Sequence, residues 1–497
     1  MDVYKALVVW TLALATLPLV SQSPPANSSP SDLQPGVLLP RQTCAAKPDQ
    51  SYALYLPSHY TPDKRWPIVY AFDPDGRGNV PVELMQDAAE QYGYIVAGSN
   101  NSRNGSWKVE GDAAQAVWDD THARLAIDDR HVYFAGFSGG ARVASVLAQR
   151  CKCAAGVLLS GAGFGGPPPS QDAKFAVFAA VGSFDFNYPE LSELDGKLDQ
   201  AGYPHALRHF DGPHEWAPSE VMDEALAWFR LMAMKQDRDA KHQAFIGAEK
   251  MKATARAHGL EESGDSYEAW REYKQAVATF TGLADTASLQ QSAVSLAQQK
   301  SVRDGAKREA QEFEEQRRLT GEIYSGLIAL KSNAKGPSQT PQADQPIVPR
   351  SGAPAAHSDS VSRSDIFHQT EQQIVALREK TASEAHPDKM RVYRRALSGV
   401  FIAAGEFGDE SLAAKNYAAA KDYFQLAVDA YPDSVGGLKE LATARALDND
   451  RKGTLETLRR AKEKSNDAAA FIAWLNEEPA FAKLRDDPQF RALLANP

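Results

Sequence analysis

The sequence predicts an α/β domain with a mostly parallel sheet flanked by helices, followed by an all-α helical repeat domain. Three observations support this. Apolar strand-like segments alternate with helix-like segments up to about residue 235. From about Gln236 onward Ala, Glu, Lys, Gln and Arg dominate, which is the composition of helices. A chain of 497 residues is also longer than one hydrophobic core usually serves.

The N-terminus has the pattern of a secretory signal. Lys5 precedes an apolar run, and a stretch rich in Ser and Pro follows it. We therefore predict a signal peptide over residues 1–22 and a disordered linker over residues 23–43. An uncleaved membrane anchor at residues 6–20 is the alternative, although this run is short for a membrane span. The expected location is secreted or periplasmic.

The composition divides the rest of the chain. We expect the α/β domain over residues 44–235 and a helical region with a partial tetratricopeptide-like repeat over residues 236–332, which includes a long surface helix over residues 303–330. Residues 333–364 are rich in Pro, Ser, Gln and Ala with few large apolar side chains, so we interpret them as a flexible linker. Residues 365–497 form the expected C-terminal helical domain.

A G-x-S-x-G motif at residues 136–140 is the strongest functional signal. It follows a strand-like stretch, His131–Ala135, and precedes a helix-like stretch, Ala141–Gln149. Strand, motif and helix together indicate a nucleophile elbow, a sharp turn that exposes the central serine. The flanking glycines fit this interpretation because strand and helix pass too closely there for a Cβ. The motif therefore predicts Ser138 as a nucleophile.

A serine nucleophile needs a histidine that accepts its proton and a carboxylate that orients the histidine. The apolar run Lys174–Val181 predicts a buried strand and ends just before Asp185. The alternating segment Ala206–Phe210 predicts an edge strand and leads to His214, ahead of an amphipathic helix from about Ser219 to Met234. All candidates thus follow strand carboxyl ends, where open α/β sheets build their sites.

Other residues of the same types fit these roles less well. Asp211 is the main rival to Asp185, but it is typical of a turn residue before a glycine. His205 and His209 belong to the predicted edge strand or its approach, so neither is expected at the site.

Residues 44 to about 234 resemble the small, lidless α/β-hydrolases related to esterase D, feruloyl esterases and polyhydroxyalkanoate depolymerases. The resemblance rests on four blocks: Gln50–Pro57, Arg65–Phe72, Ile127–Tyr133 and Gly136–Gly140. It implies a Ser-Asp-His triad of Ser138, Asp185 and His214, with the backbone N–H of Gly139 as one oxyanion donor. It also implies carboxylic-ester hydrolysis without a cofactor or a metal ion; thioester or amide substrates remain open.

The predicted oxyanion loop departs from this family. Relatives usually carry His-Gly-Gly after the preceding strand, whereas this chain carries Asp73-Pro74-Asp75-Gly76. Pro74 has no N–H, so Asp75 or Gly76 would have to supply the second donor. Losing one such donor costs about two to three orders of magnitude in rate. The alternative function is therefore an inactive hydrolase fold that acts as an envelope binding or scaffold module.

Aromatic side chains surround the expected site entrance. Phe137, Phe184 and Trp216 would form an apolar acyl or aryl pocket, or simply pack together. The insert between the strands at Leu159 and Lys174 is too short for a substantial lid. We therefore expect a small soluble or polymer-end ester as substrate.

Three cysteines allow disulfide formation in an exported protein. We expect Cys44 to pair with Cys151 or Cys153, and three buried thiols are the alternative. A zinc site is not expected because no histidine lies at ligand spacing beside them.

Part of the C-terminal region has the spacing of a tetratricopeptide repeat. The matching positions are Phe407, Gly408, Tyr417, Ala420, Phe424, Ala427 and Pro432. Helical arrays of this kind present surfaces to partner proteins, so a protein partner is expected, and a purely stabilising domain is the alternative. A net charge of −10 without a dense basic patch argues against nucleic acid as a partner.

Overall fold

The computed structural model describes residues 33–169, 173, 175–332 and 362–495. The predicted signal peptide and most of the predicted linker at residues 333–364 therefore lie outside the described residues. Within the described segments, no helix is both long and apolar enough to cross a membrane.

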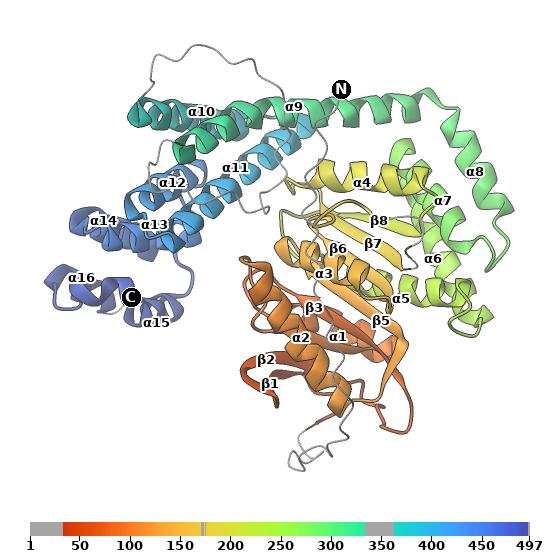
Figure 1. Ribbon diagram of the computed structural model, residues 1–497. Coiled ribbons are helices and arrows are strands. Elements are labelled where there is room, and N and C mark those ends of the chain that lie inside the picture. The colour runs from red at the N-terminus through yellow and green to blue at the C-terminus, as the bar shows by residue number, and fades with distance from the viewer. Residues whose placement is uncertain (1–32, 170–172, 174, 333–361, 496–497) are drawn as a thin grey trace, which may run out of the picture. The chain divides into compact units, whose positions relative to one another are not determined.

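An eight-stranded sheet forms the centre of the first domain, with the strand order β1-β2-β4-β3-β5-β6-β7-β8 (Figure 1). Strands β1 and β2 pair antiparallel with each other, β2 pairs antiparallel with β4, and the remaining pairs are parallel. The strands are β1 (Leu39–Cys44), β2 (Lys47–Tyr55), β3 (Trp66–Phe72), β4 (Ile95–Ser99), β5 (Ile127–Phe137), β6 (Ala154–Ser160), β7 (Ala176–Gly182) and β8 (His205–Phe210).

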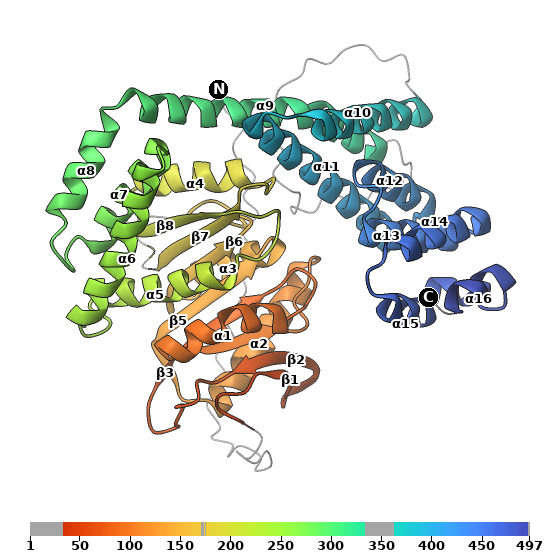
Figure 2. The same cartoon turned by 180° about the vertical axis from the view of Figure 1, so that it is seen from behind.

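Helices cover both faces of this sheet. The helices are α1 (Asn79–Tyr92), α2 (Trp107–Arg124), α3 (Gly139–Arg150), α4 (Tyr188–Gln200) and α5 (Ser219–Lys235). Helices α1 and α5 pack together on one face, seen in front in Figure 2, and α2 and α3 lie on the opposite face. Because β6 and β7 are covered on both sides, every residue in them is buried. This arrangement confirms the predicted α/β class, with a mostly parallel sheet flanked by helices.

The crossing of β5, α3 and β3 explains the glycines of the elbow motif. A Cβ on Gly136 would lie 2.0 Å from the carbonyl oxygen of Gly140. A Cβ on Gly140 would lie 2.0 Å from the carbonyl oxygen of Phe72 at the end of β3. Both partners are backbone atoms, so a side chain at either position forces strand and helix apart.

The helices after α5 extend the core of the α/β domain. They are α6 (Gln243–Glu262), α7 (Ser266–Phe280), α8 (Ala287–Ala297) and α9 (Lys300–Ser332). Ile246, Tyr273 and Leu289 belong to the same buried cluster as the residues beneath the sheet. The Trp228 indole in α5 also donates to Thr279 Oγ1 in α7 at 3.1 Å. The hydrophobic core therefore continues past the boundary predicted at residue 235.

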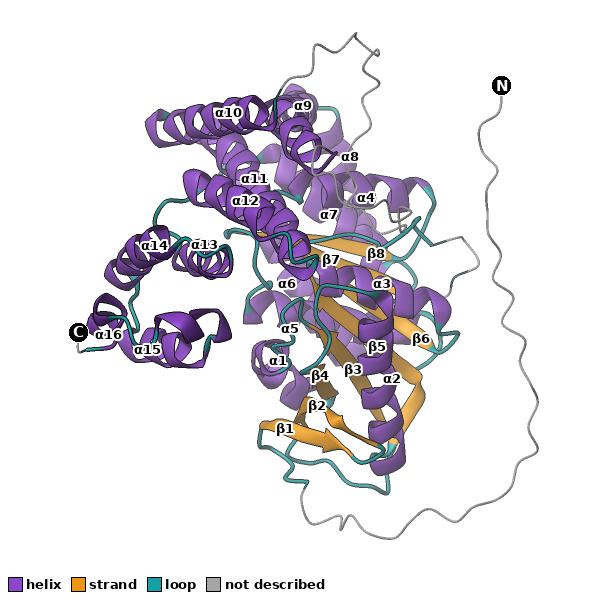
Figure 3. Ribbon diagram, turned by 60° about the vertical axis from the view of Figure 1, so that its left-hand side comes forward, coloured by secondary structure: helices purple, strands orange, loops and turns teal. Residues whose placement is uncertain are grey.

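The last segment consists of helices joined by loops (Figure 3). It contains α10 (Arg363–Ser383), α11 (Pro387–Ala413), α12 (Tyr417–Ala430), α13 (Val435–Leu447), α14 (Arg451–Lys464), α15 (Ala468–Glu477), the 3₁₀ helix η2 (Pro479–Leu484) and α16 (Pro488–Leu494). Ala420, Phe424 and Ala427 are fully buried, and a Cβ on Gly408 would lie 2.5 Å from the Phe424 ring. Small residues thus allow α11 and α12 to approach closely; the tetratricopeptide assignment itself stays a prediction.

Two predicted linker boundaries need correction. Residues 39–43 of the predicted disordered linker 23–43 belong to β1, because pairing with β2 satisfies their backbone. At the other linker, α10 begins at Arg363, before the predicted end at residue 364. Ser362 forms a capping box with Asp365, which fixes this helix start.

The expected pairing of Cys44 is wrong. Cys151 and Cys153 form a disulfide with each other after α3, with a Cα–Cα distance of 5.1 Å. Cys44 is a free thiol at the end of β1, only 1% exposed. Its burial raises the pKa of the thiol to about 11, so the thiol stays protonated at neutral pH.

We expect Gly140→Ala to destabilise the fold by about 3 kcal/mol, because the new Cβ overlaps the backbone of β3. The matched control is Gly196→Ala in α4, where a Cβ meets nothing within 4 Å. This control should gain roughly 0.5 kcal/mol, since alanine restricts the unfolded chain. Urea unfolding midpoints measure both effects; equal stability of the two variants would contradict the close crossing.

Candidate active site

Ser138 occupies the turn between β5 and α3 in a strained backbone conformation. Its φ is 51° and its ψ is −121°, a combination that residues other than glycine rarely adopt. The surrounding backbone holds it there: the Ser138 N–H donates to the carbonyl of Ser160 at 2.9 Å, and the Ser138 carbonyl accepts from Ala141 N–H at 3.0 Å. The strain is therefore maintained by contacts with β6 and α3.

A continuous chain of hydrogen bonds joins the three predicted residues. Ser138 Oγ lies 2.9 Å from Nε2 of His214, and Nδ1 of His214 lies 2.9 Å from Oδ2 of Asp185. The structure thus brings Ser138, His214 and Asp185 together. The rival carboxylate Asp211 instead accepts a hydrogen bond from the hydroxyl of Ser183 at an exposed position.

The alternative histidines lie away from this chain. His205 pairs with Asp195, and His209 pairs with Glu268 in α7. Both belong to β8, as the sequence predicts, and their partners come from the helices that pack beside that strand.

Asp185 lies on the loop after β7 and is completely buried. Burial raises the pKa of its carboxyl group, whereas His214 and the backbone N–H of Asn187 lower it. Asp185 Oδ1 accepts this Asn187 N–H at 2.8 Å, which leaves Oδ2 for the histidine. The carboxylate is thus oriented from both sides.

Aromatic rings enclose His214. The ring of Phe137 lies 4.6 Å from the imidazole between centroids, and the ring of Phe186 lies 4.5 Å from it. Trp216 packs on Phe137 at 5.8 Å. The predicted pocket residues Phe137 and Trp216 are thus packed around the histidine and nearly buried, whereas Phe184 is half-buried beneath the guanidinium of Arg394. The sequence analysis did not single out Phe186.

Asp73 is a buried carboxylate beside the site that accepts several hydrogen bonds. Its Oδ1 accepts the backbone N–H of Asp75 and the Nε–H of Arg77, each at 2.9 Å. Its Oδ2 accepts from the indole of Trp216 at 2.8 Å. The N–H of Gly76 donates to the Asp73 carbonyl at 3.2 Å. Both backbone donors expected for the oxyanion are therefore engaged, the Asp75 N–H by the buried carboxylate of Asp73 and the Gly76 N–H by its main-chain carbonyl.

Asn104 lies against the elbow from the loop before α2. Its backbone N–H donates to the carbonyl of Pro74 at 2.7 Å, which joins this loop to the oxyanion loop. A Cβ built on Gly139 would lie 1.8 Å from Asn104 Oδ1 and 3.4 Å from Nδ2. The Asn104 carboxamide therefore contacts Gly139 directly. No local sequence signal indicates this residue.

Acidic side chains from the C-terminal helices influence the site electrostatically. Burial raises the pKa of Glu406 in α11, and the Arg142 guanidinium and the His214 imidazole lower it. Burial raises the pKa of Glu440 in α13 to about 7, with further increases from Asp409 and Asp75. Carboxyl groups of Asp409 and Glu440 thus lie within electrostatic range of Asp75 in the predicted oxyanion loop.

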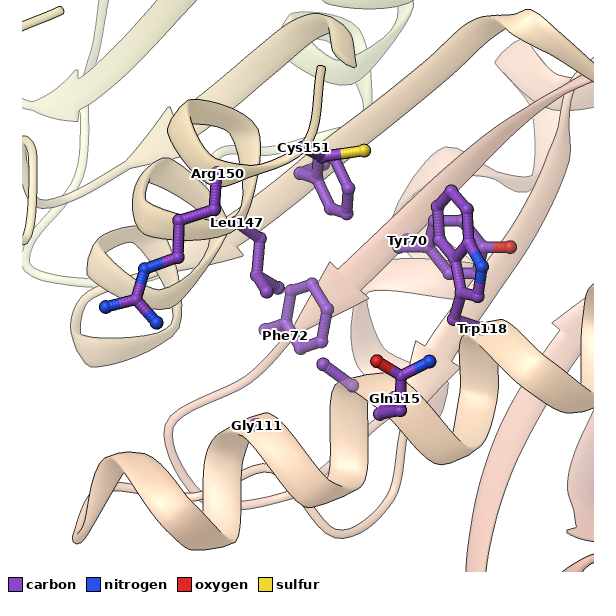
Figure 4. Close-up of a pocket in the computed structure, with 10 residues that line it drawn as sticks. Tyr70, Phe72, Gly111, Gln115, Trp118, Leu147, Arg150 and Cys151 are labelled. Carbon is purple, nitrogen blue, oxygen red and sulfur yellow. The ribbon is translucent and has the colours of Figure 1, made fainter. Parts of the chain in front are cut away.

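A separate pocket of about 250 Å³ lies between α2, α3 and the sheet (Figure 4). Its lining includes Tyr70, Phe72, Trp118, Leu147 and Cys151, and none of the residues of the Ser-His-Asp chain. Among the described residues, no group of three or more His, Cys, Asp and Glu side chains is arranged to hold a metal ion.

Solved structures similar to this chain include hydrolases and esterases. S-formylglutathione hydrolase FrmB from Staphylococcus aureus is 14% identical, with a TM-score of 0.31, over 36% of this chain and 90% of that one. A feruloyl esterase module from Clostridium thermocellum, complexed with sinapinate, is 18% identical, with a TM-score of 0.32, over 41% of this chain and 91% of that one. Esterase LipW from Mycobacterium marinum is 18% identical, with a TM-score of 0.31, over 38% of this chain and 80% of that one. No protein-family model and no curated protein sequence matches this chain.

Proposed function

We propose that this protein is a serine hydrolase that cleaves carboxylic esters through an acyl-enzyme on Ser138. The observation that carries the proposal is the hydrogen-bond chain from Ser138 through His214 to Asp185, with both distances at 2.9 Å. The strained backbone at Ser138 adds support, because such strain gathers at functional sites.

In the proposed mechanism, His214 takes the proton of Ser138 while Oγ attacks the ester carbonyl carbon. Asp185 orients the imidazole and stabilises the imidazolium that forms. His214 then returns the proton to the departing alkoxide, which leaves as an alcohol. A water molecule attacks the acyl-enzyme with the same assistance and releases the acid. The choice of an ester over a thioester or an amide follows the fold and not the geometry.

For the oxyanion, we propose the backbone N–H of Gly139 and the side-chain amide of Asn104 as donors. Asp75 and Gly76 use their N–H groups on Asp73. The Asn104 carboxamide contacts Gly139 with Oδ1 nearest to it, and no hydrogen bond among the described residues holds its N–H₂ group away. Side-chain amides serve in oxyanion holes of other hydrolases, where they stabilise the developing negative charge.

The occupied Asp75 and Gly76 donors also favour a second candidate function. In it, the hydrolase fold has no activity and the protein binds partners in the cell envelope through its helices. Export is proposed from the residue pattern at positions 1–22 alone. The experiment described next separates the two functions.

We expect a fluorophosphonate probe to label the wild-type protein on Ser138 and to leave Ser138→Ala unlabelled. The reason is that only an activated hydroxyl attacks the phosphorus. Mass spectrometry of the labelled peptide identifies the residue, and a panel of short-chain esters then tests turnover. Folded wild-type protein that takes up no label would instead favour the binding module.

Asp185→Asn should lower kcat by about 10⁴-fold, because an amide cannot fix the histidine tautomer that accepts the serine proton. Steady-state hydrolysis of the best ester in the panel measures this effect. Asp211→Asn is the matched control and should keep wild-type activity. The reverse ranking of the two variants would assign the acid role to Asp211.

Asn104→Ala should lower kcat by about 10²-fold with little change in KM, because its amide would act on the transition state. Arg103→Ala, at the exposed neighbouring position, serves as the control. Equal kcat values for Asn104→Ala and the wild type would exclude Asn104 from the oxyanion hole.

A further inference from the structure

The loop that carries Asp185 is held by side chains from distant helices. We define the acid loop as residues 183–187. Arg395 in α11 donates its Nε–H to the Ser183 carbonyl at 2.7 Å. Gln316 in α9 donates to the Phe186 carbonyl at 2.8 Å. The two contacts lie on either side of Asp185, so the helical part of the chain forms hydrogen bonds to the acid loop before and after this residue.

The α/β domain satisfies the other polar groups of this loop. Ser183 N–H donates to the Phe210 carbonyl at 2.8 Å, and Phe184 N–H donates to the Gly212 carbonyl at 2.9 Å. These contacts use N–H groups, whereas α11 and α9 supply the donors for the Ser183 and Phe186 carbonyls. Because buried carbonyls need a donor, the acid loop depends on both parts of the chain.

Burial of the Arg395 guanidinium costs desolvation free energy. Its side chain is 2% exposed, lies 3.7 Å from the ring centroid of Tyr188 and pairs with Glu312 at 3.4 Å. A buried charge gives little net stability compared with an apolar side chain of the same size. Stability alone therefore does not account for an arginine here, whereas a directed bond to the acid loop does.

Helix α11 also reaches the histidine through an apolar contact. One turn after Arg395, a Cβ on Gly399 would lie 3.1 Å from Cβ of Phe186. The ring of Phe186 in turn packs on His214 at 4.5 Å. The absence of a side chain at Gly399 lets α11 approach this close to the site.

We propose that Arg395 is a positioning residue for the hydrolase reaction, and that the C-terminal helices are an integral part of the active site. Arg395 holds the Ser183 carbonyl so that the Asp185 carboxylate meets Nδ1 of His214. This inference rests on the proposed serine hydrolase function. It assigns α11 a role in catalysis that is separate from any partner binding by the helical array.

The test compares Arg395→Ala with Arg391→Ala in the full chain. Arg391 also pairs with Glu312 but makes no contact with the acid loop, so it is a matched control. We expect Arg395→Ala to lower kcat by about 10²-fold with KM within about twofold, since a shift of about 1 Å in a positioned group has an effect of this size. Arg391→Ala should keep the wild-type kcat. Millimolar guanidinium should restore part of the lost activity in Arg395→Ala alone.

Gln316→Met provides a second variant in case Arg395→Ala fails to fold, because it removes the other donor without a change in charge. It should lower kcat several-fold at unchanged KM. Two results would overturn the positioning role if Ser138 is still labelled. One is a folded Arg395→Ala variant with wild-type kcat, and the other is a loss of kcat that guanidinium does not reverse. Wild-type protein without label on Ser138 would overturn the proposed function, and the positioning role with it.

Discussion

The hydrogen bond between the buried Asp185 carboxylate and His214 is the interaction on which the rest of this site depends. A carboxylate without solvent contact is costly, and burial raises the pKa of Asp185 accordingly. The surrounding structure offsets this cost through the imidazole and the Asn187 N–H. The groups that fix the acid loop therefore decide whether the histidine is held at hydrogen-bond distance from Ser138.

Asp73 is a second buried carboxylate, and it organises the opposite side of the site. It gathers the N–H of Asp75, the Arg77 guanidinium and the Trp216 indole. The indole links the oxyanion loop to the segment that follows His214. These hydrogen bonds engage the backbone N–H of Asp75, so in the proposed mechanism the oxyanion donors come from elsewhere. Asn104 occupies the space beside Gly139.

The helices after the α/β domain extend its hydrophobic core and pack directly against it. Residues of α6 to α8 share the hydrophobic cluster beneath the sheet, and α9 and α11 contact the acid loop. Carboxyl groups on α11 and α13 lie near the site, and burial raises their pKa values. Both halves of the chain therefore contribute groups around the site.

Much of this protein was determined by local sequence. Turn geometry requires the elbow glycines, and side-chain periodicity sets the apolar run of β7 and the edge pattern of β8. These local patterns are enough to predict Ser138, Asp185 and His214 at strand ends. Tertiary structure alone decided the pairing of Cys151 with Cys153, the occupation of the Asp75 N–H and the contact of Arg395 with Ser183, which spans 212 positions. The physical reason is that backbone propensity acts between near neighbours, whereas these contacts exist only once distant helices have packed on the sheet.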